Sequence, residues 1–319
     1  MARLLISRPL PERVLAEARA LADVTAREST APMSEAEMVA ALRDYDVVLP
    51  TLGDLFSAEI FAQAPEPRAR LLANFGVGFN HIDAGAARAA GIAVTNTPGA
   101  VTDATADIAL TLMLMTCRRA GEGERLVRAG QWAGWHPTQM LGLHMSGKRL
   151  GVVGMGRIGK AIARRAHHGF GMEVGFFNRS TVAEPGVPAQ QVPALTDLAG
   201  WADVLVVAVP GSPATRHLIG AEVLAAMQPH AHLVNIARGD VVEETALIAA
   251  LKAGQIAGAG LDVYEHEPEV PEALRGMENV TLLPHLGTAA LEVREAMGLM
   301  AVENLRAFFA GEALPNPVN

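Results

Sequence analysis

Residues 149–170 read RLGVVGMGRIGKAIARRAHHGF, and this stretch decides how the chain around it folds. Its first five residues, RLGVV, form an apolar run typical of a buried strand, and KAIARRAHHGF has the spacing of a helix. The loop between them, GMGRIG at 154–159, fits the pattern G-x-G-x-x-G. A strand, a glycine loop and a helix in this order predict a site for the pyrophosphate of a dinucleotide, in preference to an ordinary glycine turn.

Each glycine of this loop has a mechanical reason. Gly154 allows a tight turn, Gly156 lets a pyrophosphate approach the backbone, and Gly159 lets the helix pack closely on the strand. The amides at the helix N-terminus, beginning with Arg157 and Ile158, hold the negative charge. We therefore expect these five residues to bind the cofactor.

Outward from the loop, short β-branched runs alternate with alanine-rich helical stretches over most of the chain, which favours parallel sheets flanked by helices. A first, small sheet is expected from strands near residues 3–7, 46–50, 70–75 and 92–95. A second, larger sheet is expected from strands near residues 149–154, 173–178, 203–209, 231–236, 257–261 and 279–283. The fold class is α/β, with two doubly wound parallel sheets.

Two helical stretches connect the series of strands. Residues 101–120, VTDATADIALTLMLMTCRRA, are apolar nearly all the way round, which predicts a helix buried on several sides. The preceding Pro98-Gly99 is a turn signal and a candidate hinge. Residues 288–312 predict one long amphipathic helix that returns to the first domain.

Composition excludes several classes of protein. Half of the 319 residues are hydrophobic and 19% are charged, so the chain folds. A net charge of −8 without a basic cluster leaves nucleic acid little to bind. A single cysteine, Cys117, excludes an intrachain disulfide or a multi-cysteine metal site and favours a cytoplasmic setting. No apolar run is as long as that of a signal peptide or a membrane-spanning helix, so we expect no export and no membrane partner. We also expect no metal.

The end of the strand after the glycine loop indicates which dinucleotide binds. An NAD site carries an acidic residue about 20 positions after the glycines. Here FFNRS places Asn178 at that position, followed by Arg179, Ser180 and Thr181. A cation and hydroxyl groups suit a 2′-phosphate, so we expect NADP, with NAD less favoured. The alternative is that Arg179 is a solvated surface residue.

A second glycine loop, GVGFNHID at 76–83, also follows a strand. His81 occupies its third glycine position, where bulk obstructs close packing of helix on strand. A second dinucleotide site is therefore not expected, whereas amides at Val77 and Gly78 suit a small carboxylate. His81 by itself is expected to be structural.

Three late segments carry polar residues in apolar surroundings: NIARGDVVEETAL, GLDVYEHEPEV and LLPHLGTAA. Each follows a strand, where ligands of open α/β sheets bind. Taken singly, Arg238 reads as a surface salt-bridge residue, Glu267 as a solvated acid and His285 as a satisfied histidine. Together, with Glu267 29 residues after Arg238 and His285 18 residues after Glu267, they resemble the D-2-hydroxyacid dehydrogenase family.

This resemblance implies a catalytic role for each of the three. Arg238 would bind the carboxylate of a 2-oxo acid and polarise its carbonyl, helped by the amides of Val77 and Gly78. His285 would donate the proton, and Glu267 would orient the imidazole and stabilise its charged form. The reduced cofactor would supply hydride. The resemblance also assigns positions that line the cofactor, with Asp262 near the nicotinamide amide: Thr105, Pro210, Thr215, Ala237, Asp262 and Gly287.

Within the family, two further segments resemble the glyoxylate/hydroxypyruvate reductases. QWAGWHP at 131–137 matches a segment whose tryptophan, here Trp135, reaches the active site of the partner subunit. The alternative is a core or dimer-interface aromatic. PTLGD at 50–54 matches a loop that faces substrate, which makes Leu52 and Gly53 lining residues.

The resemblance implies the following whole. Two Rossmann/flavodoxin-like domains, with a cleft between them, form a homodimeric enzyme that reduces glyoxylate and hydroxypyruvate to D-2-hydroxy acids with NADPH. Residues 1–98 and 289–319 form the substrate-binding domain, and 99–288 the cofactor domain.

Other activities remain open. The runner-up enzymes are 2-ketogluconate reductase and 3-phosphoglycerate dehydrogenase, the latter needing extra cations for its substrate phosphate. A formate dehydrogenase has an amide where Glu267 stands. From another class, a corepressor-like dinucleotide sensor keeps the same fold. The natural 2-oxo acid is not readable from the sequence.

Overall fold

A computed structural model describes residues 1–319, which divide into two units. The first unit contains Met1–Val101 and Ala289–Asn319, and the second contains Thr102–Thr288. The first unit is therefore discontinuous, and the second is inserted into it. The expected break after residue 98 lies three residues before the observed one.

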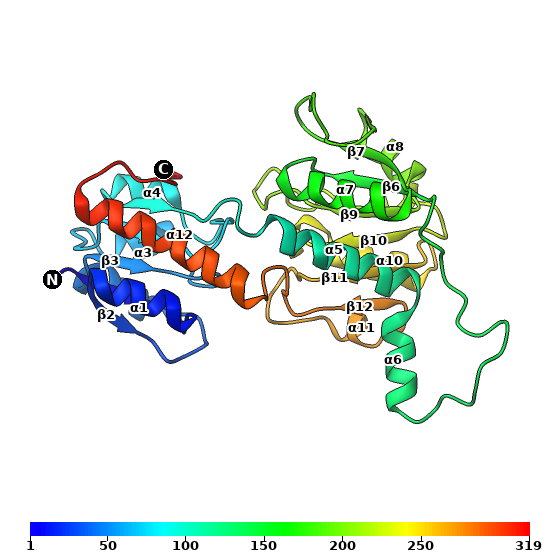
Figure 1. Cartoon of the computed structure of the whole chain (residues 1–319), viewed down its shortest axis with the longest axis horizontal. Coiled ribbons are helices and arrows are strands. Elements are labelled where there is room, and N and C mark those ends of the chain that lie inside the picture. Colours follow the sequence, from blue (N-terminus) through cyan, green and yellow to red (C-terminus); the bar gives the residue numbers. More distant parts are fainter. The chain divides into compact units, whose positions relative to one another are not determined.

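The first unit is built on a five-stranded parallel sheet (Figure 1). Its strands are β1 (Arg3–Ile6), β2 (Asp23–Ala26), β3 (Val47–Leu49), β4 (Leu71–Ala73) and β5 (Ala93–Thr95), in the order β2-β1-β3-β4-β5. Its helices are α1 (Glu12–Leu21), α2 (Glu35–Asp44), α3 (Ala58–Ala62), α4 (Ala84–Ala89) and α12 (Leu291–Ala310). Alternate residues of β1 enter two cores, Leu4 and Ile6 one and Leu5 the other, because successive side chains point to opposite faces.

The second unit is built on a seven-stranded parallel sheet, order β12-β11-β10-β9-β6-β7-β8. Its strands are β6 (Arg149–Val153), β7 (Glu173–Phe177), β8 (Ala189–Gln191), β9 (Val204–Val207), β10 (His232–Asn235), β11 (Gly258–Leu261) and β12 (Val280–Leu282). Its helices are α5 (Thr102–Cys117), α6 (Ala120–Arg128), α7 (Arg157–Phe170), α8 (Leu195–Trp201), α9 (Ala221–Ala226), α10 (Glu244–Lys252) and α11 (Glu272–Arg275), with the 3₁₀ turn η1 (Gly239–Val241).

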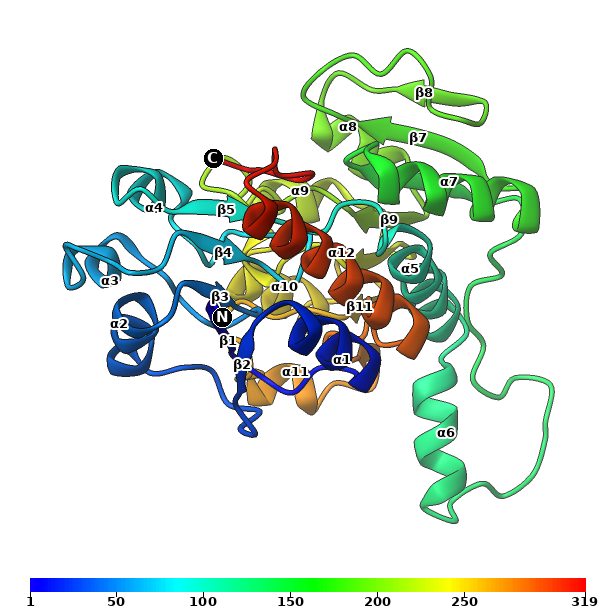
Figure 2. The same cartoon turned by 60° about the vertical axis from the view of Figure 1, so that its left-hand side comes forward.

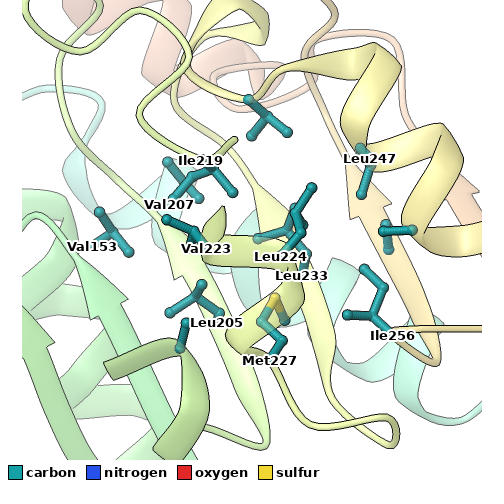
Figure 3. Packing of buried hydrophobic residues seen from close by; sticks show 14 of the residues in the cluster. Val153, Leu205, Val207, Ile219, Val223, Leu224, Met227, Leu233, Leu247 and Ile256 are labelled. Carbon is teal, nitrogen blue, oxygen red and sulfur yellow. The ribbon is translucent and has the colours of Figure 1, made fainter. Parts of the chain in front are cut away.

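Two apolar layers hold this second sheet. Leu205 and Val207 of β9 pack with α8, α9 and α10 on one face (Figure 3). Val204 and Val206 of the same strand pack with α5 and α7 on the other. The inner strands β9, β10 and β11 are buried on both faces, which explains their largely apolar sequences. No helix combines the length and apolar character that crossing a membrane requires.

All ten expected strands are present, each starting within one residue of the expected position. Two short edge strands were not expected, β2 (DVTA) and β8 (AQQ). Both have partly exposed side chains on both faces. Their sequences therefore lack the apolar pattern that indicates a strand.

The expected helix over 101–120 ends earlier, at Cys117. The carbonyl of Cys117 accepts a hydrogen bond from the Leu143 amide at 2.7 Å, and Arg119 adopts a left-handed backbone with φ 52°. The chain then turns into α6, which extends with the following segment away from the rest of the second unit (Figures 1 and 2). The burial expected for this helix comes from its own unit, since α5 packs on α7, β10 and β11. The C-terminal helix, expected over 288–312, spans Leu291–Ala310.

Candidate active site

Most candidate residues of the second unit lie at one edge of its sheet. The glycine loop follows β6, and the segments of Arg238, Glu267 and His285 follow β10, β11 and β12. In parallel strands these carboxyl ends meet at the same edge. The strand order changes direction between β6 and β9, and such a switch point is where open α/β sheets bind ligands.

The glycine loop has the geometry that a dinucleotide needs. A Cβ at Gly159 would lie 2.1 Å from the carbonyl oxygen of Gly154, so only glycine permits this packing. Gly154 itself has φ +100° and lies against the backbone of Val209, after β9. A Cβ at Gly156, in contrast, would meet nothing within 4 Å, which leaves space beside the N-terminal amides of α7. The loop therefore fits a pyrophosphate.

At the end of β7, the side chain of Asn178 folds back onto its own loops. Its Oδ1 accepts a hydrogen bond from the Met155 amide at 3.2 Å, and its Nδ2 donates to the backbone oxygen of Ser180 at 2.9 Å. Arg179, Ser180 and Thr181 are exposed, and the Arg179 guanidinium forms no ion pair. The structure thus places an exposed cation and hydroxyl groups next to the glycine loop.

Arg238 lies in a turn that Asn235 holds from both sides. Asn235 Oδ1 accepts from the Ala237 amide at 3.0 Å, and its Nδ2 donates to the Arg238 oxygen at 2.9 Å. Two glycines make room: a Cβ at Gly211 would lie 2.7 Å from Arg238 Cγ, and one at Gly239 would collide with the Tyr264 backbone. Burial lowers the pKa of the Arg238 guanidinium, an effect that the charge of Glu267 opposes. Arginine remains charged under such a change.

Glu267 and His285 form a hydrogen-bonded pair. Glu267 Oε2 lies 2.9 Å from His285 Nδ1, and its Oε1 accepts from the Tyr264 amide at 3.1 Å. Burial favours the neutral carboxyl, but the hydrogen bond and charge of His285, together with Arg238, hold the pKa of Glu267 below its ordinary value. Glu267 therefore presents a carboxylate that orients the imidazole.

Asp262 shapes the loop that carries His285. Its carboxylate accepts hydrogen bonds from the amides of Leu286 at 2.6 Å and Gly287 at 2.9 Å, while its backbone oxygen accepts from the His285 amide. His285 has a left-handed backbone with φ 55°, a strained conformation that is common at active sites. Burial raises the pKa of Asp262, and the two amides oppose that rise.

The other expected lining residues occupy neighbouring turns. Thr105, in the first turn of α5, donates to the Gly287 oxygen at 3.1 Å. Thr215 donates to the Pro210 oxygen at 2.8 Å and closes the turn after β9. Ala237 is buried beside Arg238.

In the first unit, the two expected substrate loops lie side by side. Backbone bridges join Thr51 to Phe75 and Phe56 to Ile82, so the loops after β3 and β4 are held together. Asn74 Nδ2 donates to the oxygens of Gly76 and Gly78, and Asn74 Oδ1 lies 3.0 Å from His81 Nε2. His81 is buried and joins the loop to Asn74 through this hydrogen bond. Leu52, Gly53, Val77 and Gly78 all belong to this pair of loops.

A sequence model described as "D-isomer specific 2-hydroxyacid dehydrogenase, NAD binding domain" matches residues 110–287. The chain belongs to the D-isomer-specific 2-hydroxyacid dehydrogenase family. It is 43% identical over 321 residues to a glyoxylate reductase of Korarchaeum cryptofilum, covering 99% of this chain and 96% of the relative. It is 36% identical over 312 residues to a glycerate dehydrogenase of Hyphomicrobium methylovorum, covering 97% and 96%.

Solved structures give the same family. An NADPH-dependent glyoxylate/hydroxypyruvate reductase of Sinorhizobium meliloti, in complex with NADP and malonate, has a TM-score of 0.88 at 37% identity, covering 99% of this chain and 96% of that chain. As a D-2-hydroxyacid dehydrogenase, the present chain is an oxidoreductase acting on 2-oxo and 2-hydroxy acids, and its second unit binds a nicotinamide dinucleotide.

Among the candidates of the second unit, Trp135 does not lie at the sheet edge that carries His285. The C-terminal end of α5 reaches the amino end of β11, where Thr116 approaches Gly258, and α6 begins beyond it. The segment carrying Trp135 therefore begins at the edge of the sheet opposite His285, and Trp135 is 78% exposed.

Sequence reasoning did not single out Asn235, Asn74, Arg8 or Asp54, although each holds a site loop. A signal existed for the first two, since each is an asparagine at the end of an apolar strand. Arg8 gave no local signal, because its partners Leu52 and Asp54 lie more than 40 positions along the chain, and Asp54 has only Thr51 as a nearby partner, with Ser7 and Met33 far from it in sequence.

Proposed function

We propose that this D-2-hydroxyacid dehydrogenase reduces small 2-oxo acids, with glyoxylate and hydroxypyruvate preferred, to D-2-hydroxy acids using NADPH. The observation that carries the proposal is the Glu267–His285 pair, 2.9 Å apart at the edge where the glycine loop lies. Relatives named glyoxylate reductase over nearly the whole chain support the substrate class.

In the proposed reaction each catalytic residue meets one need of the substrate. Arg238 binds the carboxylate and polarises the carbonyl with its planar fork. The amides of Val77 and Gly78 bind the carboxylate as well, and Leu52 and Gly53 line the substrate. Because Nδ1 of His285 faces Glu267, Nε2 is the atom that gives the proton to the carbonyl oxygen. NADPH, when bound, supplies the hydride.

Glu267 balances the positive charge of the protonated His285 imidazole. A carboxylate beside an imidazole stabilises the protonated form and fixes the ring. Asp262 supports the same arrangement through the backbone amides of the His285 loop, in addition to its proposed place near the nicotinamide amide.

NADPH is proposed over NADH because no carboxylate stands at residue 178. The exposed Arg179, with Ser180 and Thr181, has the cation and hydroxyl donors that a 2′-phosphate needs. A relative in this family that binds NADP supports the same preference.

We also propose a homodimer formed through α5 and the projecting segment, by which we mean residues 129–148 between α6 and β6. Large apolar side chains are exposed along this part of the chain: Leu114, Val127, Trp132, Trp135 and Leu141. Such a concentration of exposed apolar surface is typical of an interface. Because this segment begins at the edge opposite His285, we propose that Trp135 enters the active site of the partner subunit and not that of its own subunit.

A steady-state assay tests the proposed function. Oxidation of NADPH and NADH is followed with glyoxylate, hydroxypyruvate, 2-ketogluconate, pyruvate, phenylpyruvate and 3-phosphohydroxypyruvate, and the product's configuration is determined. We expect the highest kcat/KM with glyoxylate or hydroxypyruvate and NADPH, and a D-product from hydroxypyruvate. Absence of turnover with every acid would favour the dinucleotide sensor instead, and preference for a phosphorylated acid would favour that alternative dehydrogenase.

A further inference from the structure

The first unit has its own topological switch point, between β1 and β3. Its strand order, β2-β1-β3-β4-β5, changes direction there, and the loops after these two strands flank the crevice. Ser7 and Arg8 follow β1, while residues 50–54, PTLGD, follow β3. The expected substrate-lining residues Leu52 and Gly53 therefore lie next to a side chain of the loop after β1, Arg8.

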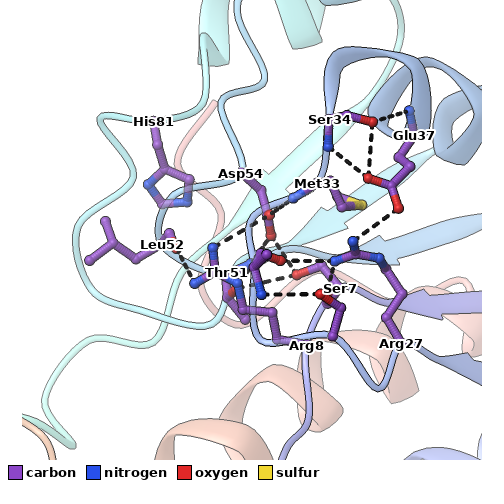
Figure 4. A network of polar contacts seen from close by, with 12 residues as sticks. Ser7, Arg8, Arg27, Met33, Ser34, Glu37, Thr51, Leu52, Asp54 and His81 are labelled. Atoms are coloured by element: carbon purple, nitrogen blue, oxygen red, sulfur yellow. Dashed lines mark hydrogen bonds and ion pairs between the residues drawn. The ribbon is translucent and has the colours of Figure 1, made fainter. Parts of the chain in front are cut away.

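Asp54 anchors this loop from inside the unit. Its side chain is fully buried, and Ser7 Oγ donates to its Oδ2 at 2.5 Å (Figure 4). The amides of Thr51 and Met33 donate to the same carboxylate, each at 2.9 Å. A buried carboxylate with this many donors has little freedom to move, so both ends of the 51–54 segment are fixed.

Arg8 holds the middle of the loop. Its Nη1 donates to the Leu52 oxygen at 2.7 Å, and its Nη2 lies 3.9 Å from Asp54 Oδ1 (Figure 4). Gly53 has φ +100°, and a Cβ there would lie 2.8 Å from Arg8 Nη2. The guanidinium thus occupies the space beneath Gly53, and it fixes the direction of the Leu52 peptide. No other side chain donates to the backbone of Leu52 or Gly53.

We propose that Arg8, held in place by Asp54, is a positioning residue that sets the conformation of the Leu52–Gly53 loop and thereby the affinity for the 2-oxo acid. This inference rests on the proposed function, in which Leu52 and Gly53 line the substrate. Because the loop would contact substrate equally before and during hydride transfer, its displacement raises KM and leaves kcat nearly unchanged.

A second arginine of the same unit provides a matched control. Arg27 donates to the oxygens of Ser7 at 2.7 Å and Ala31 at 3.2 Å and pairs with Glu37 at 2.9 Å. Its side chain is 17% exposed and that of Arg8 is 22% exposed, but Arg27 makes no contact with residues 51–54. Loss of either arginine removes one charge, together with one hydrogen bond for Arg8 and three for Arg27, so Arg27 is a stringent control for effects on stability alone.

The experiment compares Arg8→Met, Arg8→Lys and Arg27→Met in the full-length enzyme. We expect Arg8→Met to raise KM for glyoxylate about tenfold, the equivalent of one lost charge-assisted hydrogen bond, with kcat within about twofold. Arg8→Lys keeps the charge and one donor, so it recovers part of this loss. Arg27→Met, which loses three hydrogen bonds, should lower the Tm at least as much as Arg8→Met while keeping the parental KM. If Arg8→Met does not fold, the Arg8→Lys and Arg27→Met pair is compared in the same way.

Hydrogen exchange of the peptide covering residues 50–56 provides a readout that needs no turnover. We expect faster exchange in Arg8→Met than in the parent, and no change in Arg27→Met. Parental exchange in Arg8→Met, or an equal KM rise in Arg27→Met, would overturn the positioning role. If the parent enzyme turns over no 2-oxo acid, the proposed function is wrong. The exchange data would still test separately whether Arg8 sets the conformation of the Leu52–Gly53 loop.

Discussion

At the scale of single residues, the hydrogen bond between Glu267 and His285 has a direct kinetic consequence. General acid catalysis is typically worth about 10²–10⁴-fold in rate, so His285→Ala should lower kcat by about that factor. The dissociation constant for NADPH should stay within about twofold, because the imidazole is assigned to the substrate and not to the dinucleotide. Stopped-flow turnover and cofactor fluorescence titration measure the two quantities.

The matched control is His266→Ala, in the same loop as Glu267. His266 is exposed, and its side chain has no hydrogen bond in the structure. Its removal should leave kcat at the parental value. A His285→Ala enzyme that turns over as fast as His266→Ala would contradict the proton-donor role.

The proposed preference for NADPH also rests on single side chains. A contact between Arg179 and a 2′-phosphate is worth about 1.5–3 kcal/mol, or about 10- to 150-fold in affinity. We therefore expect kcat/KM with NADPH to exceed that with NADH at least about tenfold. Asn178→Asp with Arg179→Ala should shift the preference toward NADH, mainly through KM for cofactor. A double variant that retains the parental preference would identify Arg179 as a surface residue only.

At the scale of elements, the close approach of α7 to β6 depends on one glycine. Gly159→Ala would place a Cβ 2.1 Å from the Gly154 oxygen, so the helix must shift. Overpacking of this kind typically costs about 1–3 kcal/mol, and the displaced amides should weaken NADPH binding by at least about tenfold. Urea unfolding and a binding titration give both numbers.

The same helix offers the opposite substitution as its control. A Cβ at Gly169 would meet nothing within 4 Å, and its φ is not in the left-handed region. Gly169→Ala should therefore stabilise the protein by about 0.5–1 kcal/mol and leave NADPH binding unchanged. Equal behaviour of the two alanine variants would refute the packing argument.

At the scale of the whole molecule, the exposed apolar side chains of the projecting segment predict that the protein forms a dimer. Light scattering at micromolar concentration should report a dimer. Trp135→Ala should alter the ranking of substrates if the indole enters the partner's active site, whereas Val127→Ser, on α6, should weaken assembly without changing that ranking. A monomeric parent would remove the basis for the proposed dimer.

Acid stability of the whole molecule depends in part on a histidine far from the active edge. Burial of His232 in β10 lowers its pKa to about 4 from an ordinary 6.5. Between these values the unfolded chain binds a proton that the folded chain does not, so stability falls as the pH falls from about 6.5 to about 4. At pH 5 the protonation of His232 in the unfolded chain lowers the free energy of unfolding by about 2 kcal/mol.

His232→Asn should therefore show a flatter decline of Tm between pH 7 and pH 5 than the parent. His168 lies exposed on α7, so His168→Asn removes a histidine without removing a buried one and should keep the parental slope. Calorimetry at pH 7, 6 and 5 measures the slopes. A His232→Asn slope as steep as that of the His168→Asn control would show that another group causes the acid sensitivity.

The sequence by itself determined the series of buried strands, the glycine loop and the resemblance to a family that the comparisons confirm. These features are local: an apolar run, a G-x-G-x-x-G pattern and a motif around an arginine, an acid or a histidine are each read within a few residues. The ten expected strands are found for this reason, because strands that are mostly buried carry apolar runs that can be read locally.

Only the tertiary structure decided the features that join distant parts of the chain. α5 ends at Cys117 because Leu143, 26 residues later, caps it, and Arg8 reaches the Leu52 oxygen across 44 positions. The edge strands β2 and β8 exist because β1 and β7 offer them hydrogen-bonding groups, although their own side chains are partly exposed. A pairing of this kind depends on two segments that the fold brings together, and the sequence of neither segment predicts which other segment it will contact.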